Sequence, residues 1–90
     1  MSVTVNIPQF LQQGTDEVKA ANVDGGTVGE CLNDLVQRFP RLKPLLFNKS
    51  DKLHGYLEVF VNRESAYPEE LARPVSNGDE LHIINIIMGG

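Results

Sequence analysis

One stretch of the chain, residues 28–39, has the spacing of an amphipathic helix and limits what the rest can form. Its apolar residues recur at offsets of three, four, seven and eleven, which places them on one stripe of the helix. They are Val28, Cys31, Leu32, Leu35 and Phe39. Thr27 and Glu30 have the spacing of a capping box, with Thr27 as N-cap and Glu30 reaching back to the Thr27 amide. Pro40 is expected to end the helix.

Two other segments alternate apolar and polar residues, which predicts half-buried strands. The first, residues 3–7, places Val3, Val5 and Ile7 on one face and ends at Pro8. The second, residues 56–61, places three apolar residues on one face and three mixed residues on the other. The first set is Leu57, Val59 and Val61, and the second is Tyr56, Glu58 and Phe60.

Weaker signals fill the remaining chain. Residues 9–16 are expected to form a turn or loop, followed by a weaker strand over residues 17–23 that residues 24–26 break before Thr27. Residues 41–47 predict a short helical turn and residues 48–55 a charged loop. A turn at residues 62–65 leads to a short edge segment near Ala66 and Tyr67, and residues 77–79 form a strong turn signal.

The last ten residues read as an apolar strand that runs into Gly89 and Gly90. Two successive glycines add no stability to a fold, and they make a thin, unbranched tip. In extended form, residues 88–90 reach roughly 10 Å beyond the sheet. We therefore hypothesise that the Gly90 carboxylate is the functional group and enters a buried site in a partner.

The order of elements is strand, strand, helix, short helix, strand, short strand, strand. This order predicts an α+β fold in which the helix crosses one face of a mixed sheet of four to five strands. With the first and last strands adjacent at the centre, Ile7 and Ile83 would line the same core. The other face of the last strand would carry His82, Ile84 and Ile86.

An exposed apolar patch beside a functional tip often marks a docking surface. The residues expected to dock a partner are Phe60, Ile84, Ile86 and Met88.

Composition narrows the function classes. A chain of 90 residues predicts a single domain, residues 1–90, whose tail is residues 88–90. A net charge of −4 with scattered basic residues argues against nucleic acid and favours protein partners with a basic entrance. No apolar run approaches a membrane span and no secretory signal is evident, so we expect a cytoplasmic protein.

Three side chains with reactive groups have plainer interpretations. Cys31 lies on the apolar stripe, so a buried thiol is favoured over a nucleophile. His54 and His82 are too isolated to predict a metal site, and both are expected at the surface or at a sheet edge.

Taken together, the motifs resemble the ubiquitin-like sulfur carrier family of MoaD and ThiS. The resemblance rests on the opening strand, the helix start at Thr27, residues 61–64, residues 77–79 and the terminal Gly89 and Gly90. It implies a β-grasp fold. Three features look similar to carriers that feed cysteine or homocysteine synthesis: the step from Ile7 to Pro8, the long segment over residues 9–21, and residues 52–54.

The resemblance also implies a function. A MoeB/ThiF-like enzyme would adenylate Gly90 using its own ATP and magnesium, and a persulfide donor would convert the carboxylate to a thiocarboxylate. The chain would then be a protein cosubstrate with no bound cofactor, and a synthase would accept the sulfur. Molybdopterin, thiazole and an amino acid all remain open as acceptors. The alternatives are a modifier conjugated to lysines through Gly90, and a binding module whose tail is incidental.

Overall fold

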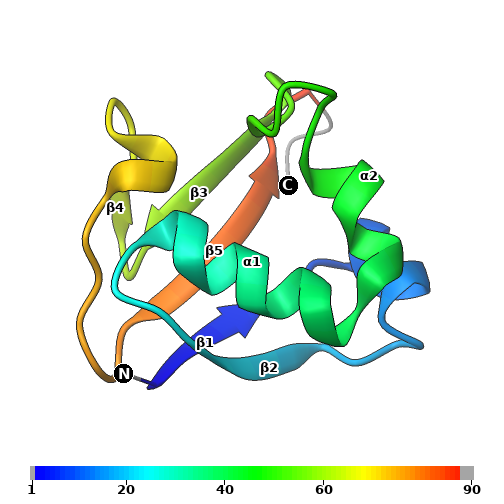
Figure 1. The fold of residues 1–90 in the computed structure, drawn as a ribbon, viewed down its shortest axis with the longest axis horizontal. Coiled ribbons are helices and arrows are strands. Elements are labelled where there is room, and N and C mark those ends of the chain that lie inside the picture. The colour runs from blue at the N-terminus through cyan, green and yellow to red at the C-terminus, as the bar shows by residue number, and fades with distance from the viewer. Residues whose placement is uncertain (1, 88–90) are drawn as a thin grey trace.

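A computed structural model describes residues 2–87, and Met1 and residues 88–90 lie outside the described part. Within that part, five strands form one sheet in the order β2-β1-β5-β3-β4 (Figure 1). The strands are β1 (Ser2–Asn6), β2 (Ala20–Asp24), β3 (Leu57–Val61), β4 (Glu64–Ser65) and β5 (Glu80–Asn85). β1 and β5 are parallel, and the other neighbours are antiparallel. The predicted central pairing of the first and last strands is confirmed.

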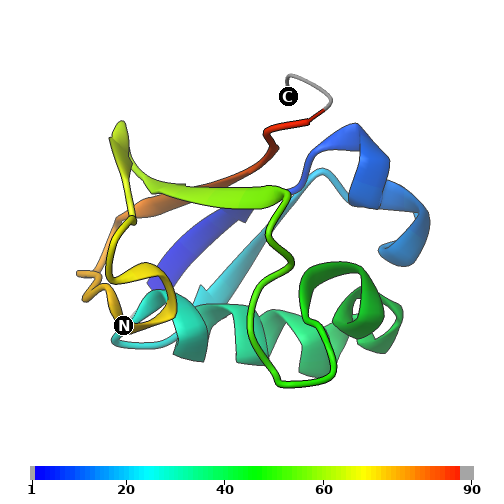
Figure 2. The ribbon, with the colours of Figure 1, turned by 90° about the horizontal axis from the view of Figure 1, so that it is seen from above.

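The helices gather on one face of this sheet. They are η1 (Gln9–Gly14), α1 (Val28–Arg38), η2 (Pro40–Leu42), α2 (Lys43–Leu46) and η3 (Glu70–Ala72). Figure 2 shows α1 and α2 on the same side of the strands, with the opposite face uncovered. This arrangement is the β-grasp fold. None of the described helices is long and apolar enough to cross a membrane.

The start of α1 confirms one half of the expected capping box and corrects the other. The Thr27 hydroxyl accepts a hydrogen bond from the Glu30 amide at 3.1 Å. The Glu30 carboxylate, however, accepts from the amide of Gly26 at 2.7 Å instead of the amide of Thr27. A Cβ on Gly26 would lie 3.4 Å from the carboxylate, which is an ordinary contact, so this bond does not require glycine at position 26. A Cβ on Gly25 would lie 2.7 Å from the Cys31 amide, so this turn requires glycine.

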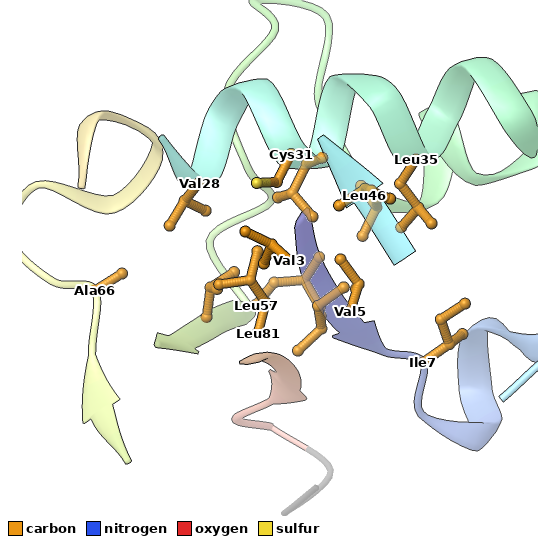
Figure 3. Close-up of a cluster of buried hydrophobic side chains, with 14 of the residues drawn as sticks. Val3, Val5, Ile7, Val28, Cys31, Leu35, Leu46, Leu57, Ala66 and Leu81 are labelled. Atoms are coloured by element: carbon orange, nitrogen blue, oxygen red, sulfur yellow. The ribbon is translucent and has the colours of Figure 1, made fainter. Parts of the chain in front are cut away.

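The core lies between α1 and the sheet, and Figure 3 shows its side chains. The predicted stripe of α1 is buried, and only Phe39 at its end is partly exposed. Ile7 and Ile83 are both buried in the same cluster, as predicted. Each large apolar side chain buried in this way stabilises the fold by about 1.5–3 kcal/mol.

Several predicted boundaries differ from the structure. The segment expected as a loop after Pro8 forms the short helix η1, and the weak strand β2 begins later than expected. The edge segment expected near Ala66 and Tyr67 is β4, two residues earlier. This happens because Asn62 adopts a left-handed conformation (φ 57°), so the chain reverses tightly and Glu64 already pairs with Val61.

Candidate functional site

The uncovered face of the sheet carries a mixed surface along β3 and β5. Because side chains alternate along a strand, the residues between the core positions all point to this face. Phe60 pairs with His82, and Glu58 pairs with Ile84. A shallow hollow of about 480 Å³ lies over this part of the sheet. Its lining includes Pro8, Phe60, Asn62, Arg63, His82 and Ile84.

We call Pro8, Phe60 and Ile84 the open-face patch. Phe60 and Ile84 are half-buried and lie diagonally across β3 and β5. Diagonal neighbours of this kind are within reach of long side chains. β1 and β5 are parallel, and Asn6 lies beside His82. Two residues further along both segments, Pro8 therefore comes toward Ile84.

The polar side chains around the patch largely bond to one another. Thr4 donates to Asn22 at 2.9 Å, and Asn6 donates to Glu80 at 3.2 Å. At the other side of the sheet, Ser65 donates to the Glu58 carboxylate at 2.6 Å. These groups already have partners, so the apolar patch is the part of the face with most to gain from contact with another molecule.

The end of β5 is held at a fixed point. The Ile86 amide donates to the Tyr56 carbonyl at 2.9 Å, which extends the pairing with β3 by one residue. The Ile87 amide then donates to the Asn85 side chain at 3.0 Å and turns the chain out of the sheet. Asn85 is buried, whereas Ile86 and Ile87 are 53% and 79% exposed. The chain therefore leaves the sheet at one position with two isoleucines in solvent.

This turn corrects the sequence analysis, which extended the last strand to the glycines. Ile86 does not continue the face of His82 and Ile84, because it lies beyond the strand and lines a different hollow at the β3 edge. The sequence analysis also missed Asn85 and Ile87. The signal was an asparagine within a run of isoleucines, since an asparagine side chain can bond to the backbone amide two residues on.

The predicted docking residues are thus only partly brought together. Phe60 and Ile84 share one face, and Ile86 stands apart near the point where the chain leaves the sheet. Met88, Gly89 and Gly90 lie outside the described residues. The docking role of these residues stays a prediction.

The Cys31 side chain is buried, as predicted. Burial, followed by the nearby charges of Glu30 and Asp34, raises the pKa of the thiol to about 11. Since the thiolate is the nucleophilic form, Cys31 is unsuited to attack at neutral pH.

The two histidines each contact a neighbouring group of the chain. The His54 ring lies 2.8 Å from the Pro44 carbonyl and stacks on Tyr56, and His82 lies 3.8 Å from the Glu80 carboxylate. Residues 2–87 contain no group of three or more side chains able to hold a metal ion.

Comparison with known proteins identifies close relatives over nearly the whole length. The model of the ThiS family matches residues 4–90. Small archaeal modifier protein 1 of Haloferax volcanii is 34% identical over 70 residues, which is 77% of each chain.

Solved structures give the same result for the fold. The structure of the BexX/CysO complex from Amycolatopsis orientalis matches with a TM-score of 0.88 and 35% identity, covering 98% of this chain and 99% of that one. CysO of Mycobacterium tuberculosis matches with a TM-score of 0.84 and 30% identity, covering 92% and 97%.

Proposed function

Since this chain belongs to the ThiS family, we propose that it carries sulfur as a thiocarboxylate on Gly90. The observation that carries the proposal is that the family match runs through both terminal glycines. The likeness to two CysO structures supports the resemblance to carriers that feed cysteine synthesis, so we propose an amino-acid precursor as the acceptor of the sulfur. The protein is then a cosubstrate, and the catalytic groups belong to its partners.

The proposed chemistry has three steps. A carboxylate oxygen of Gly90 attacks the α-phosphorus of ATP on an adenylating enzyme, and pyrophosphate leaves. A persulfide sulfur attacks the resulting acyl adenylate, and AMP leaves. A thiol then attacks the donor sulfur of the acyl disulfide, which breaks the S–S bond, releases the thiocarboxylate and leaves a new disulfide between that thiol and the sulfur donor. The sulfur anion is a nucleophile for the same reason that a thiolate is one.

The geometry of the described residues supports separate roles for the folded domain, which would dock the enzyme, and the C-terminal tip, which would react. The open-face patch offers apolar surface beside the end of β5, and β5 is anchored in the centre of the sheet. A MoeB/ThiF-like enzyme that covers the patch would hold the body while the tip enters its nucleotide site. The net charge of −4 favours a basic surface around that entrance.

Intact mass spectrometry tests the proposal. The full chain is incubated with a MoeB/ThiF-like enzyme, ATP, magnesium, a persulfide donor and a thiol reductant. We expect the mass to rise by the difference between sulfur and oxygen, with pyrophosphate released in equal amount. A chain that ends at Met88 is the control and should show neither change. Release of pyrophosphate without any gain of sulfur in the full chain would contradict the carrier role.

The similarity to a small archaeal modifier protein supports a second function. In that case the activated Gly90 is attacked by the amine of a target lysine, AMP leaves and an isopeptide bond forms. Tryptic peptides from cells that express a tagged chain would then contain a target lysine joined through Gly90 to residues 64–90, because trypsin cleaves after Arg63 and Pro74 blocks cleavage after Arg73. If only thiocarboxylate and free carboxylate are recovered at Gly90, conjugation is excluded and the carrier function stands alone.

A further inference from the structure

The two outer edges of the sheet differ in how their outward backbone groups are hydrogen-bonded. On β2, the carbonyl of Asn22 accepts a hydrogen bond from Arg38 at 2.5 Å, and the amide of Asp24 donates to Asp34 at 2.9 Å. Arg38 and Asp34 also form an ion pair at 3.2 Å. Side chains of α1 therefore occupy outward backbone groups of β2, which hinders the addition of another strand there.

The β3 edge lacks such a cover along its first half. The short strand β4 pairs only with the end of β3, and the last bond joins the Ala66 amide to the Val59 carbonyl at 2.8 Å. The Ala66 carbonyl then turns away and accepts from the Glu70 amide at 2.6 Å. Among residues 2–87, the outward carbonyl of Leu57 and the outward amide of Val59 have no hydrogen-bond partner. Leu57 and Val59 are only 4% and 2% exposed, and both line a groove at this edge of the sheet.

An apolar groove lies directly beside these two groups. It has a volume of about 290 Å³. Its apolar lining is formed by Leu53, Leu57, Val59, Ala66, Tyr67 and Ile86. Tyr67 is 72% exposed, so one wall of the groove stands in solvent. The exposed carboxylate of Glu70 also belongs to the lining.

We propose that this groove binds an extended peptide segment of a partner protein as an added parallel strand on β3. In a parallel ladder, one residue donates to a carbonyl of the neighbouring strand and accepts from the amide two residues further on. The Leu57 carbonyl and the Val59 amide have this spacing. The peptide places an apolar side chain in the groove and a lysine or arginine beside Glu70. The net charge of −4 on this protein also favours a basic residue in the peptide.

The same geometry argues against a symmetric dimer. Two β3 edges related by a two-fold axis perpendicular to the sheet would pair antiparallel. An antiparallel pair centred on Glu58 would use the Leu57 carbonyl and the Val59 amide of each copy. It could not extend further, because the Leu57 amide already donates to the His54 carbonyl at 3.0 Å. It would also place the Glu58 side chains of the two copies directly opposite each other, and like charges in that position are destabilising. The occupant is therefore a separate peptide and not a second copy of β3.

Selection from a random twelve-residue peptide library on the immobilised full chain tests this inference. We expect the enriched peptides to combine an apolar residue with a lysine or arginine. When the best peptide is synthesised and added, the Val59 amide should exchange with solvent at least about tenfold more slowly, because it becomes bonded. Unchanged exchange at Val59, or the absence of any enriched sequence, would overturn the proposal.

Two charge-reversal variants identify the site. Glu70→Lys should weaken binding of the same peptide by about tenfold or more. Glu17→Lys is the matched control, because Glu17 is also exposed and also has a positive φ (68° against 51° for Glu70), but it precedes β2 at the other side of the sheet. Equal weakening by both variants would show that only net charge matters and would also refute the proposed site. A chain that ends at Met88 should bind the peptide normally, which separates this inference from the proposed sulfur chemistry.

Discussion

The two faces of the central strands share one backbone but differ in burial and in role. On β5, Leu81 and Ile83 face α1 and are buried, whereas His82 and Ile84 face solvent. The covered face supplies the stability of the fold, and the open face presents surface to partners. Because residues one apart on a strand point in opposite directions, each task can be altered without the other. Three changes test how complete this separation is.

The largest effect is expected on the covered face. Leu35 is fully buried beneath the sheet, so Leu35→Ala removes apolar contacts and leaves a cavity. We expect the free energy of unfolding to fall by roughly 2–5 kcal/mol in urea titrations. Leu35→Met, which conserves volume, should lose less than about 1.5 kcal/mol.

Sulfur loading of Leu35→Ala, measured per folded molecule, should equal that of the wild type. A lower rate under conditions in which the variant is fully folded would mean that the core also shapes the docking surface.

A smaller effect on stability is expected on the open face. Ile84 is only half-buried, so Ile84→Ala should lower the free energy of unfolding by roughly 1 kcal/mol. Its main effect should be on docking, seen as a raised KM for the adenylating enzyme with kcat nearly unchanged. Thr4 is also half-buried and faces the same side at a distance along the sheet, so Thr4→Ala is the control. If the two variants have the same KM, the open-face patch is not the docking surface.

Local signals in the sequence predicted most of this fold. The helix followed from its apolar period, Thr27 and Pro40, and the core faces of β1 and β3 followed from alternation. These features depend on neighbours along the chain, so they can be recognised without the rest of the structure. The resemblance to the carrier family added the β-grasp topology, which the comparisons confirm.

The features that the sequence did not predict depend on individual hydrogen bonds that interrupt the apolar patterns. The last strand ends at Asn85 because a side chain bonds to the backbone there, although the apolar run continues. The β3 edge is open because Ala66 directs its carbonyl to Glu70. Alternation alone could not show either feature, because both depend on hydrogen bonds and not on apolar spacing; Asn85 within the run of isoleucines was the one signal that the sequence offered. Part of the open-face patch was predicted, namely Phe60 and Ile84. The register between β3 and β5 brings these two residues together and leaves Ile86 outside the patch.

The smallest effect is expected at a turn that belongs to neither face. Asp79 precedes β5, and its carboxylate accepts hydrogen bonds from the Ser76 amide at 2.8 Å and the Asn62 side chain at 3.1 Å. The first bond and then the second lower the pKa of Asp79 below its usual value. A lowered pKa in the folded state stabilises the protein above the pKa of the unfolded chain, and this contribution disappears as the pH falls through the folded pKa.

Asp79→Asn should therefore reduce the loss of stability as the pH falls from neutral to about 3, with most of the difference appearing below the ordinary aspartate pKa of about 3.9. Urea midpoints across this range measure the effect, with Asp51→Asn in the exposed loop as the control. Sulfur loading at neutral pH should be the same in all three proteins, because the turn lies at the start of β5 and the tip follows its end. A loading defect in Asp79→Asn alone would show that the position of the tip depends on both ends of β5. Stability and function would then not be separated between the two faces of the sheet alone.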